Sequence, residues 1–210
     1  MAEITALETQ KKNPKRVNLF VDGRFVVGLD LETAVKERLE VGREINEREI
    51  KYLIEISGRQ KILDRVFRFL SYRPRSKKEV RDYLRKKKID ENEVEDILDR
   101  LSEKNYLDDE EFARWWVEQR ISFRPSGVRL LRMELNQKGI PKDIIAKSLN
   151  RYLAKDSEQE LAQKVMEKKL RTLRHLPPLE LKQKLSTHLA RRGFSWETIE
   201  TVVDGILKKK

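Results

Sequence analysis

The sequence predicts a mainly α-helical protein, with three tandem three-helix repeats behind a small N-terminal module that contains a β-hairpin. Composition is the first observation behind this fold class: among 210 residues only 8 are Gly and 6 are Pro, while 40% are charged. That mixture suits long helices and supplies few turn residues for an all-β fold. The second observation is an internal repeat, and the third is one alternating segment near the N-terminus.

The alternating segment covers residues 17–27 and has Asp22 and Gly23 at its centre. Asp-Gly between β-rich runs is a strong hairpin signal, because both residues accept the positive φ angles of a type I′ turn. A two-stranded hairpin is marginal in water by itself. We therefore expect its apolar side to pack on two helices that follow, at residues 31–38 and 46–55.

The internal repeat consists of three blocks that start 51 and 54 residues apart and have apolar residues at matching offsets around them. The blocks are Leu84–Ile89, Leu135–Ile140 and Leu189–Phe194. We interpret each block as the turn between two helices. Gly139 and Gly193 suit the left-handed residue that follows a helix, and Lys88 stands at the same position in the first block, where a left-handed conformation costs on the order of 1 kcal/mol.

A further helix is predicted before each block, at residues 59–70, 109–123 and 158–174, so that each repeat has three helices. Ser57 and Gly58 are predicted to end the N-terminal module. The predicted organisation is a hairpin and helix module at residues 1–58 and three-helix repeats at residues 59–107, 108–155 and 156–210.

Four consecutive acids, Asp108 to Glu111, lie in the segment Tyr106–Ala113. Clustered carboxylates could hold Mg²⁺ in a nuclease. A structural interpretation accounts for them better: Asp108 caps a helix, Glu111 completes a capping box, and the acids between them favour the positive end of the helix dipole. No further metal-binding partner stands at a suitable spacing, so we expect no metal site.

Charge is distributed in blocks along the repeats, with net charges of +10, −9 and +7 over residues 59–88, 89–119 and 120–155. On a helix that Ser76 begins, basic residues recur every three or four positions beside a buried stripe. We expect these residues, and a similar set in the second repeat, to contact DNA or a DNA-bound protein filament; ion pairs with the acidic block are the alternative. The candidates are Arg73, Arg75, Lys77, Arg81, Arg85, Lys88, Arg120, Arg124, Arg129 and Arg132.

Aromatic residues and histidines provide no catalytic pattern. Phe112, Trp115 and Trp116 share one predicted helix and could stack on unpaired bases, but this spacing is more typical of a core. Trp196 is expected to pack locally. The two histidines belong to no recognisable triad, and there is no Walker A run, dinucleotide fingerprint or zinc-protease motif. We expect a protein that is not an enzyme and uses no cofactor.

The net charge of +11 favours a polyanionic partner, for which nucleic acid is the natural candidate. The sequence contains no Cys, which excludes disulfides and thiolate metal sites and fits a reducing compartment. No stretch is long and apolar enough to span a membrane, and the first 16 residues lack the apolar region of a signal peptide. These features predict a cytoplasmic protein, which we expect to be a monomer.

Three motifs resemble, in order and spacing, those of the RecX regulatory proteins. They are Arg73-Pro-Arg-Ser with Glu79, Tyr106-Leu-Asp-Asp-x-x-Phe-Ala, and Glu134-Leu-x-x-Lys-Gly-Ile. The resemblance is strong from about Leu63 to Tyr152 and looser in the third repeat. It is weak in the hairpin module, which is similar to the N-terminal extension of some members. Lys88 departs from the family's usual Gly.

This resemblance implies an elongated, curved array of three-helix repeats. It also implies that the protein binds the RecA filament in its helical groove, together with single-stranded or double-stranded DNA, and inhibits ATP hydrolysis, strand exchange and repressor cleavage. A stand-alone nucleic-acid-binding protein is the alternative function, because the net charge alone would suffice for it.

Overall fold

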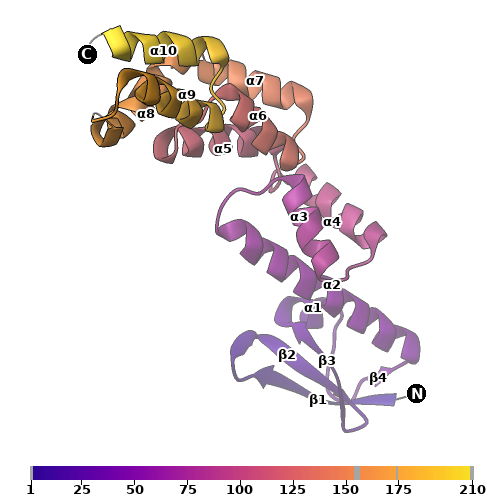
Figure 1. Cartoon of the computed structure of the whole chain (residues 1–210). Helices are drawn as coiled ribbons and strands as arrows, with labels where there is room; N and C mark the ends of the chain where they lie inside the picture. Colours follow the sequence, from indigo (N-terminus) through magenta and orange to yellow (C-terminus); the bar gives the residue numbers. More distant parts are fainter. Residues whose placement is uncertain (1, 154–156, 174, 209–210) are drawn as a thin grey trace. The chain divides into compact units, whose positions relative to one another are not determined.

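The computed structural model describes residues 2–153, 157–173 and 175–208. It contains two compact units, of which the first ends at Tyr72 and the second begins at Arg73. The first unit holds all the strands of the described residues and two helices (Figure 1). Its elements are β1 (Ala2–Gln10), β2 (Asn13–Val21), β3 (Arg24–Asp30), α1 (Leu31–Lys36), β4 (Glu44–Ile45) and α2 (Glu47–Ser71). No helix among the residues described is long and apolar enough to cross a membrane.

The predicted hairpin is confirmed, but it belongs to a larger sheet. Strands β2 and β3 pair antiparallel around Asp22 and Gly23, both of which have positive φ. The sheet has the order β3-β2-β1-β4, so β1 and β4 were missed from the sequence. Ile4 is the one core residue of β1, and the β1–β2 connection is Lys11-Lys12, which carries no Gly or Asn signal.

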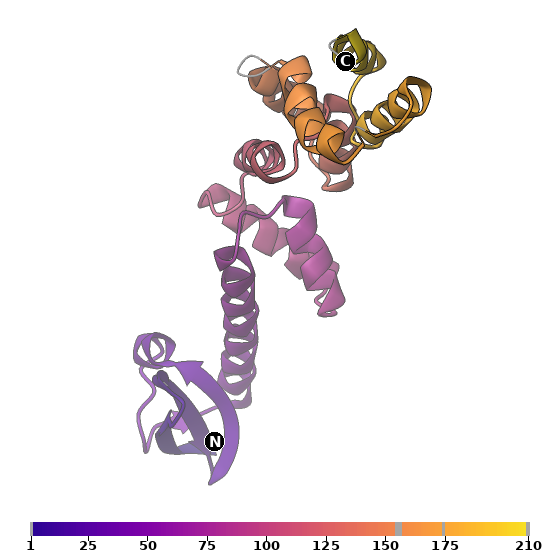
Figure 2. The ribbon, with the colours of Figure 1, turned by 60° about the vertical axis from the view of Figure 1, so that its left-hand side comes forward.

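Helix α2 is one continuous helix, where the sequence predicted a break at Ser57 and Gly58 (Figure 2). Ser57 is buried, and its hydroxyl donates a hydrogen bond to the Gly28 carbonyl of β3 at 2.7 Å. Gly58 is exposed with nothing near its Cα, a position where glycine costs a helix only about 1 kcal/mol. The serine therefore attaches α2 to the sheet and does not end it, and Leu53 joins the core beneath the strands.

The second unit is entirely helical in its described residues. Its elements are α3 (Lys77–Lys86), α4 (Glu91–Glu103), α5 (Asp109–Phe123), α6 (Val128–Gln137), α7 (Lys142–Leu153), α8 (Glu158–Leu173), α9 (Pro178–Arg191) and α10 (Trp196–Lys208). Helices α5 to α7 pack on one another, as do α8 to α10 (Figure 1). Helices α3 and α4 pack on each other and follow α2 along the chain. The predicted mainly α fold with three-helix repeats is confirmed.

The apolar positions that define the repeat lie in the core, as their shared offsets predict. Nearly all of them are buried, and Ile89 and Ile206 are partly exposed. The buried positions are Val80, Leu84, Val94, Leu98, Leu101, Leu131, Leu135, Ile145, Leu149, Tyr152, Leu185, Leu189, Ile199 and Val203. Burial at the same offsets in each repeat means that the periodicity records one packing scheme used three times.

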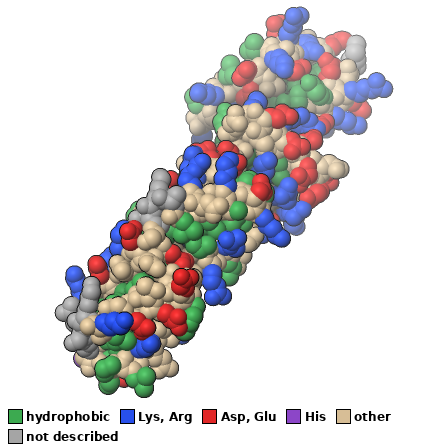
Figure 3. Space-filling model, turned by 90° about the horizontal axis from the view of Figure 1, so that it is seen from above, with side chains coloured by type: hydrophobic (Ala, Val, Ile, Leu, Met, Phe, Trp, Pro, Cys, Tyr) green, Lys and Arg blue, Asp and Glu red, His purple; other side chains and the backbone are tan. Residues whose placement is uncertain are grey.

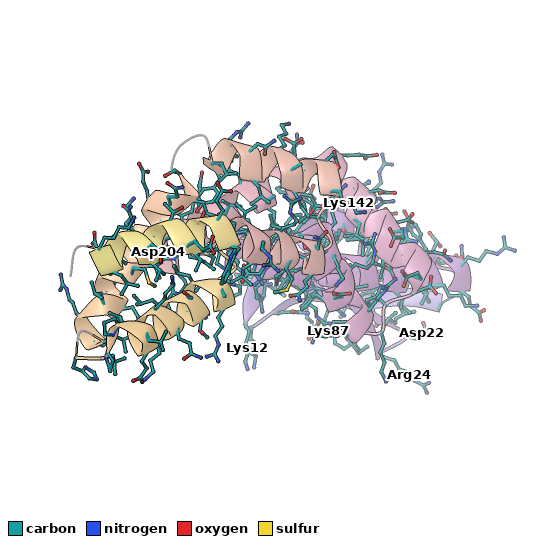
Figure 4. The ribbon with its side chains drawn as sticks, turned by 45° about the horizontal axis from the view of Figure 1, so that its top comes forward. Lys12, Asp22, Arg24, Lys87, Lys142 and Asp204 are labelled. Atoms are coloured by element: carbon teal, nitrogen blue, oxygen red, sulfur yellow. The ribbon has the colours of Figure 1, made fainter. Side chains whose placement is uncertain are left out.

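The helix ends follow the predicted local chemistry in most places. Ser76 caps α3 through the Glu79 amide, and Asp108 accepts hydrogen bonds from two amides at the start of α5. Asp204 of α10, labelled in Figure 4, pairs with Lys182 of α9 at 2.8 Å. The prediction that Trp196 packs locally is wrong. This residue is the first of α10 and is 63% exposed.

Candidate functional site

The ten predicted basic residues differ in their surroundings. Four form ion pairs with carboxylates, and three arginines of the second repeat are exposed with no such pair among the described residues. The paired residues are Arg73, Arg81, Arg85 and Arg120. On the face drawn in Figure 3, Lys and Arg side chains are interspersed with Asp and Glu, which agrees with this division.

Two of the candidate basic residues on α3 are neutralised by carboxylates of α4. Arg81 forms a bidentate pair with Glu95, with nitrogen to oxygen distances of 2.8 and 2.9 Å. One turn further along α3, Arg85 forms a second bidentate pair, with Glu91. The hydrogen bond from Arg81 lowers the pKa of Glu95, which keeps the carboxylate charged. Ion pairing with the acidic block, the alternative considered from the sequence, therefore occurs at both residues.

Arg73 belongs to a half-buried cluster around Glu79. Its guanidinium binds both carboxylate oxygens of Glu79 at 2.9 Å, and Lys138 of the second repeat reaches the same carboxylate at 2.6 Å. Burial alone would raise the pKa of Glu79, but the hydrogen bonds from Arg73 and Lys138 lower it. Burial and the nearby Arg73 lower the pKa of Arg75. This cluster joins α3 to the second repeat and leaves Arg73 little freedom to bind a ligand.

Two of the aromatic residues predicted on α5, Phe112 and Trp116, are also engaged within the protein. Phe112 is buried, as predicted for a core residue. The Trp116 ring has the Arg120 guanidinium 4.7 Å and the Lys138 ammonium 5.0 Å from its centroid, and its indole nitrogen donates to Glu134 at 2.9 Å. Arg120 pairs with the same carboxylate at 2.8 Å. Two cations over one ring leave it poorly available for stacking on a base.

The start of α3 is attached to the second repeat by two hydrogen bonds. The backbone amide of Lys77 donates to the Asp109 carboxylate at 2.9 Å, and the Ser76 hydroxyl donates to the Lys138 carbonyl at 2.8 Å. Burial raises the pKa of Asp109, although the bond from Lys77 opposes that shift. Asp109 thus has a role that the sequence did not reveal, because its partner lies in another repeat.

The start of α6 is attached to the third repeat in the same way. The backbone amide of Val128 donates to the Glu158 carboxylate at 3.0 Å, and that of Gly127 donates to the Arg192 carbonyl at 2.9 Å. Val128 and Arg192 occupy the repeat positions of Lys77 and Lys138. We call the two arrangements the first and second junctions; each fixes the start of a middle helix to the turn of the next repeat.

These junctions explain where the turn residue must be glycine. A Cβ atom at Gly139 would lie 2.8 Å from Lys78 Cβ, and one at Gly193 would lie 2.4 Å from Leu130. Both glycines have positive φ, and Lys88 adopts the same left-handed conformation, with φ of 59°. Lys88 is exposed, because no helix start packs on the turn of the first repeat within the second unit. The departure from glycine is therefore confined to the one turn that has room for a side chain.

Three arginines of the second repeat are exposed: Arg124, Arg129 and Arg132. None of their side chains forms a hydrogen bond or ion pair within the part of the chain that the structure describes. Burial lowers the pKa of the nearby Arg192, and the positive charge of Arg124 lowers it further. Arg192 was missed as a candidate, although its repeat position, one residue before Gly193, matches that of Lys138.

The acidic run at the start of α5 has partners within the protein. Asp109 accepts from Lys77, and Glu110 pairs with Lys147 of α7 at 2.9 Å. Over residues 2–153, 157–173 and 175–208, no group of three or more His, Asp or Glu side chains is placed to hold a metal ion. Asp108 caps α5 as predicted, but the described residues show no hydrogen bond from the Asp108 amide to Glu111, so the predicted capping box is only half formed.

Family models match most of the chain. The model of the regulatory protein RecX N-terminal domain matches residues 2–46. Models of the first, second and third three-helix domains of RecX match residues 63–101, 108–149 and 156–203. The hairpin module, where the sequence motifs gave only a weak resemblance, is thus matched as well.

Individual relatives agree with these models. The chain is 37% identical to the regulatory protein RecX of Bacillus subtilis (strain 168) over 98% of its own length and 78% of that protein's. It is 33% identical to the regulatory protein RecX of Listeria innocua, over 93% and 72% of the two lengths. A crystal structure of regulatory protein RecX superimposes with a TM-score of 0.74 at 28% identity, and covers 97% of this chain and 100% of the other.

Proposed function

The chain belongs to the RecX family of regulatory proteins, and we propose that it binds the RecA–DNA filament and inhibits ATP hydrolysis, strand exchange and the coprotease activity of RecA. In this way it would restrain recombination, DNA repair and the SOS response. The family is named for regulation and not for a reaction. We infer that this protein acts by binding, as a cytoplasmic monomer with no cofactor of its own.

The single observation that carries this proposal is the set of exposed arginines in the second repeat. Arg124, Arg129 and Arg132 are cations without a partner among the described side chains, so a DNA phosphate or a carboxylate of a protein filament can bind them without first breaking an ion pair. At Arg81 or Arg85 the same contact must displace a bidentate glutamate. We therefore assign filament binding first to the second repeat.

The two junctions also support the proposal, because they fix the positions of the helices that carry the basic residues. Each junction combines an acidic side chain, a helix start and a glycine turn, and these contacts hold the second repeat to its neighbours on both sides. Basic residues on helices fixed in this way keep a constant spacing, which lowers the entropy lost on binding a regular filament. We propose that the helices of the second unit act as one such preorganised array, and that the chain is organised as a module of residues 1–58 and three-helix repeats of residues 59–107, 108–155 and 156–210.

The test is the ATP hydrolysis of RecA on single-stranded DNA, measured while the full chain is titrated in. Binding of the chain to the same DNA without RecA is measured at the same salt concentration. The proposal predicts inhibition at concentrations far below those that cover naked DNA. Inhibition only when the DNA itself is covered, with a steep salt dependence, would indicate the stand-alone nucleic-acid-binding protein instead. Full RecA turnover at every ratio would contradict both.

A further inference from the structure

A cleft of about 570 Å³ lies where the C-terminal end of α5 meets α8 and the C-terminal end of α9. Its volume is within the range of roughly 300–1,000 Å³ that ligand sites occupy. Four cationic side chains line it, against the single carboxylate of Glu167. The cations are Lys164, Lys168, Lys169 and Arg192.

Two of these cations, Lys168 and Lys169, carry positive charge that is open to a ligand. Lys168 and Lys169 form no ion pair with any residue that the structure describes. Burial lowers the pKa of His188, which lines the same cleft, and the charges of Arg192, Lys169 and Arg191 lower it further. An anion bound in the cleft would offset these charges and favour the protonated histidine.

Phe123 gives the cleft an aromatic edge. It is the last residue of α5, and 81% of its side chain is exposed. The ring also lines a second hollow of about 240 Å³, formed with Trp115, Trp116 and Arg124. Phe123 therefore stands between two neighbouring hollows that both carry arginines. The ring is therefore open to contact from a ligand in either hollow.

We propose that this cleft binds the phosphodiester backbone of a single nucleic-acid strand, one base of which stacks on Phe123. Lysines that follow the backbone and an aromatic ring that receives a base are the two components by which proteins hold single strands. Lys168 and Lys169 contact phosphates, and Arg124 continues the positive surface beyond the ring. The inference rests on the proposed function only for the source of the strand, which is the DNA of the filament.

Two features favour a strand over a free phosphate compound. The cationic groups are distributed over α8 and the end of α9, as a chain of phosphates requires, whereas a single phosphate would need them to converge on one point. The exposed ring has no role in binding inorganic phosphate. A duplex is disfavoured because its bases are already stacked and cannot reach Phe123.

The charge component is tested in the full chain with the double substitution K168Q/K169Q. Binding of a fluorescent oligothymidylate of about 12 nucleotides is measured over a range of salt concentrations. We expect affinity to fall about tenfold and the slope of log affinity against log salt to become shallower by about 1.4, because two phosphate contacts are lost. K51Q/K61Q, which removes two exposed charges from α2, is the matched control and should leave the slope unchanged.

The aromatic component is tested with F123A and F123W. Loss of the ring should weaken binding of the oligothymidylate about tenfold, while F123W should preserve it. An abasic strand of the same length has the phosphates without the bases, so F123A should not change its affinity. The control is L179A, which removes another exposed apolar side chain, from α9.

His188 provides a readout inside the cleft. NMR titration of its ring protons should show a pKa that rises when the oligothymidylate is bound, because phosphates offset the surrounding cations. The His175 signal serves as the internal reference.

The inference is overturned if K168Q/K169Q and F123A bind the strand like their controls, or if the wild-type chain binds no strand at low salt. Displacement of the strand by inorganic triphosphate at similar concentrations would assign the cleft to a free phosphate compound and also overturn it. The proposed function is judged separately, by inhibition of RecA, which can persist through Arg129 and Arg132 even where the cleft variants behave like wild type.

Discussion

The first and second repeats place arginines at equivalent positions, yet these arginines have different surroundings. Arg132 occupies the repeat position of Arg81. In the first repeat Glu95 pairs with Arg81, whereas the position of Glu95 in the second repeat is Ala146. Ala146 cannot pair with Arg132, so the arginine is exposed. The facing helix, and not the arginine pattern itself, thus decides whether a basic ridge is available to a partner.

The same comparison extends to Glu91, the partner of Arg85. The equivalent position in the second repeat is Lys142, which is exposed at the start of α7 (Figure 4). Helix α4 therefore neutralises α3, while α7 adds positive charge beside α6. The first repeat therefore pairs Arg81 and Arg85 internally, whereas the second repeat leaves Arg132 and Lys142 exposed.

The largest expected effect comes from breaking the second junction with G193A. The added Cβ would lie 2.4 Å from the backbone nitrogen of Leu130, and Gly193 has a φ of 78° that disfavours alanine. We expect a loss of at least about 3 kcal/mol in the free energy of unfolding, from overpacking and backbone strain together. Urea denaturation measures it. G205A, at an exposed helical glycine of α10, should instead be neutral or stabilising; an equal loss in both would contradict the junction.

The first junction depends on charge, and E79Q should reveal it. Removing the carboxylate leaves Arg73 and Lys138 half-buried without their partner, which we expect to cost about 2 kcal/mol. The folded-state pKa of Glu79 is lowered, so its stabilisation is present above its ordinary pKa of 4.5 and is lost as the pH falls below it. Wild type should therefore lose more stability than E79Q between about pH 5 and pH 3 in denaturation series. Parallel losses would contradict the role of Glu79.

Exchanging the partners of the two equivalent arginines tests the comparison directly. A146E should provide Arg132 with a carboxylate and weaken binding to RecA-coated DNA about fivefold, while E95A should expose Arg81 and strengthen it by a similar factor. Fluorescence anisotropy measures both. T9E introduces the same charge on an exposed site of β1 and controls for net charge. If A146E and T9E have equal effects, the exposure of Arg132 is irrelevant to binding.

Much of this architecture could be predicted from the sequence because it depends on local chemistry. Ser76 and Asp108 cap the helices they were expected to cap, and Gly139 and Gly193 are left-handed. Strand β1 was missed because Lys11-Lys12 carries no turn signal and its pattern buries little.

The candidate site was harder to predict because its contacts are distant in sequence. Glu79 and Lys138 are 59 residues apart, and the pairing of Arg81 with Glu95 depends on how two helices face each other. Spacing along one helix identifies a ridge of cations, but it contains no information on the carboxylates opposite.

The smallest expected effect, K88G, tests why the first turn differs from the other two. Glycine relieves the left-handed strain at Lys88 but adds freedom to the unfolded chain, so the free energy of unfolding should change by less than about 1 kcal/mol. The reverse change, G139K, should cost several times more, because Lys78 occupies the space its side chain needs. Thermal unfolding of both variants measures the difference. If G139K is tolerated as well as K88G, no helix start packs on the second turn in solution, and the first junction is wrong. If K88G instead destabilises the protein strongly, the Lys88 side chain has a partner, and the first turn is not open.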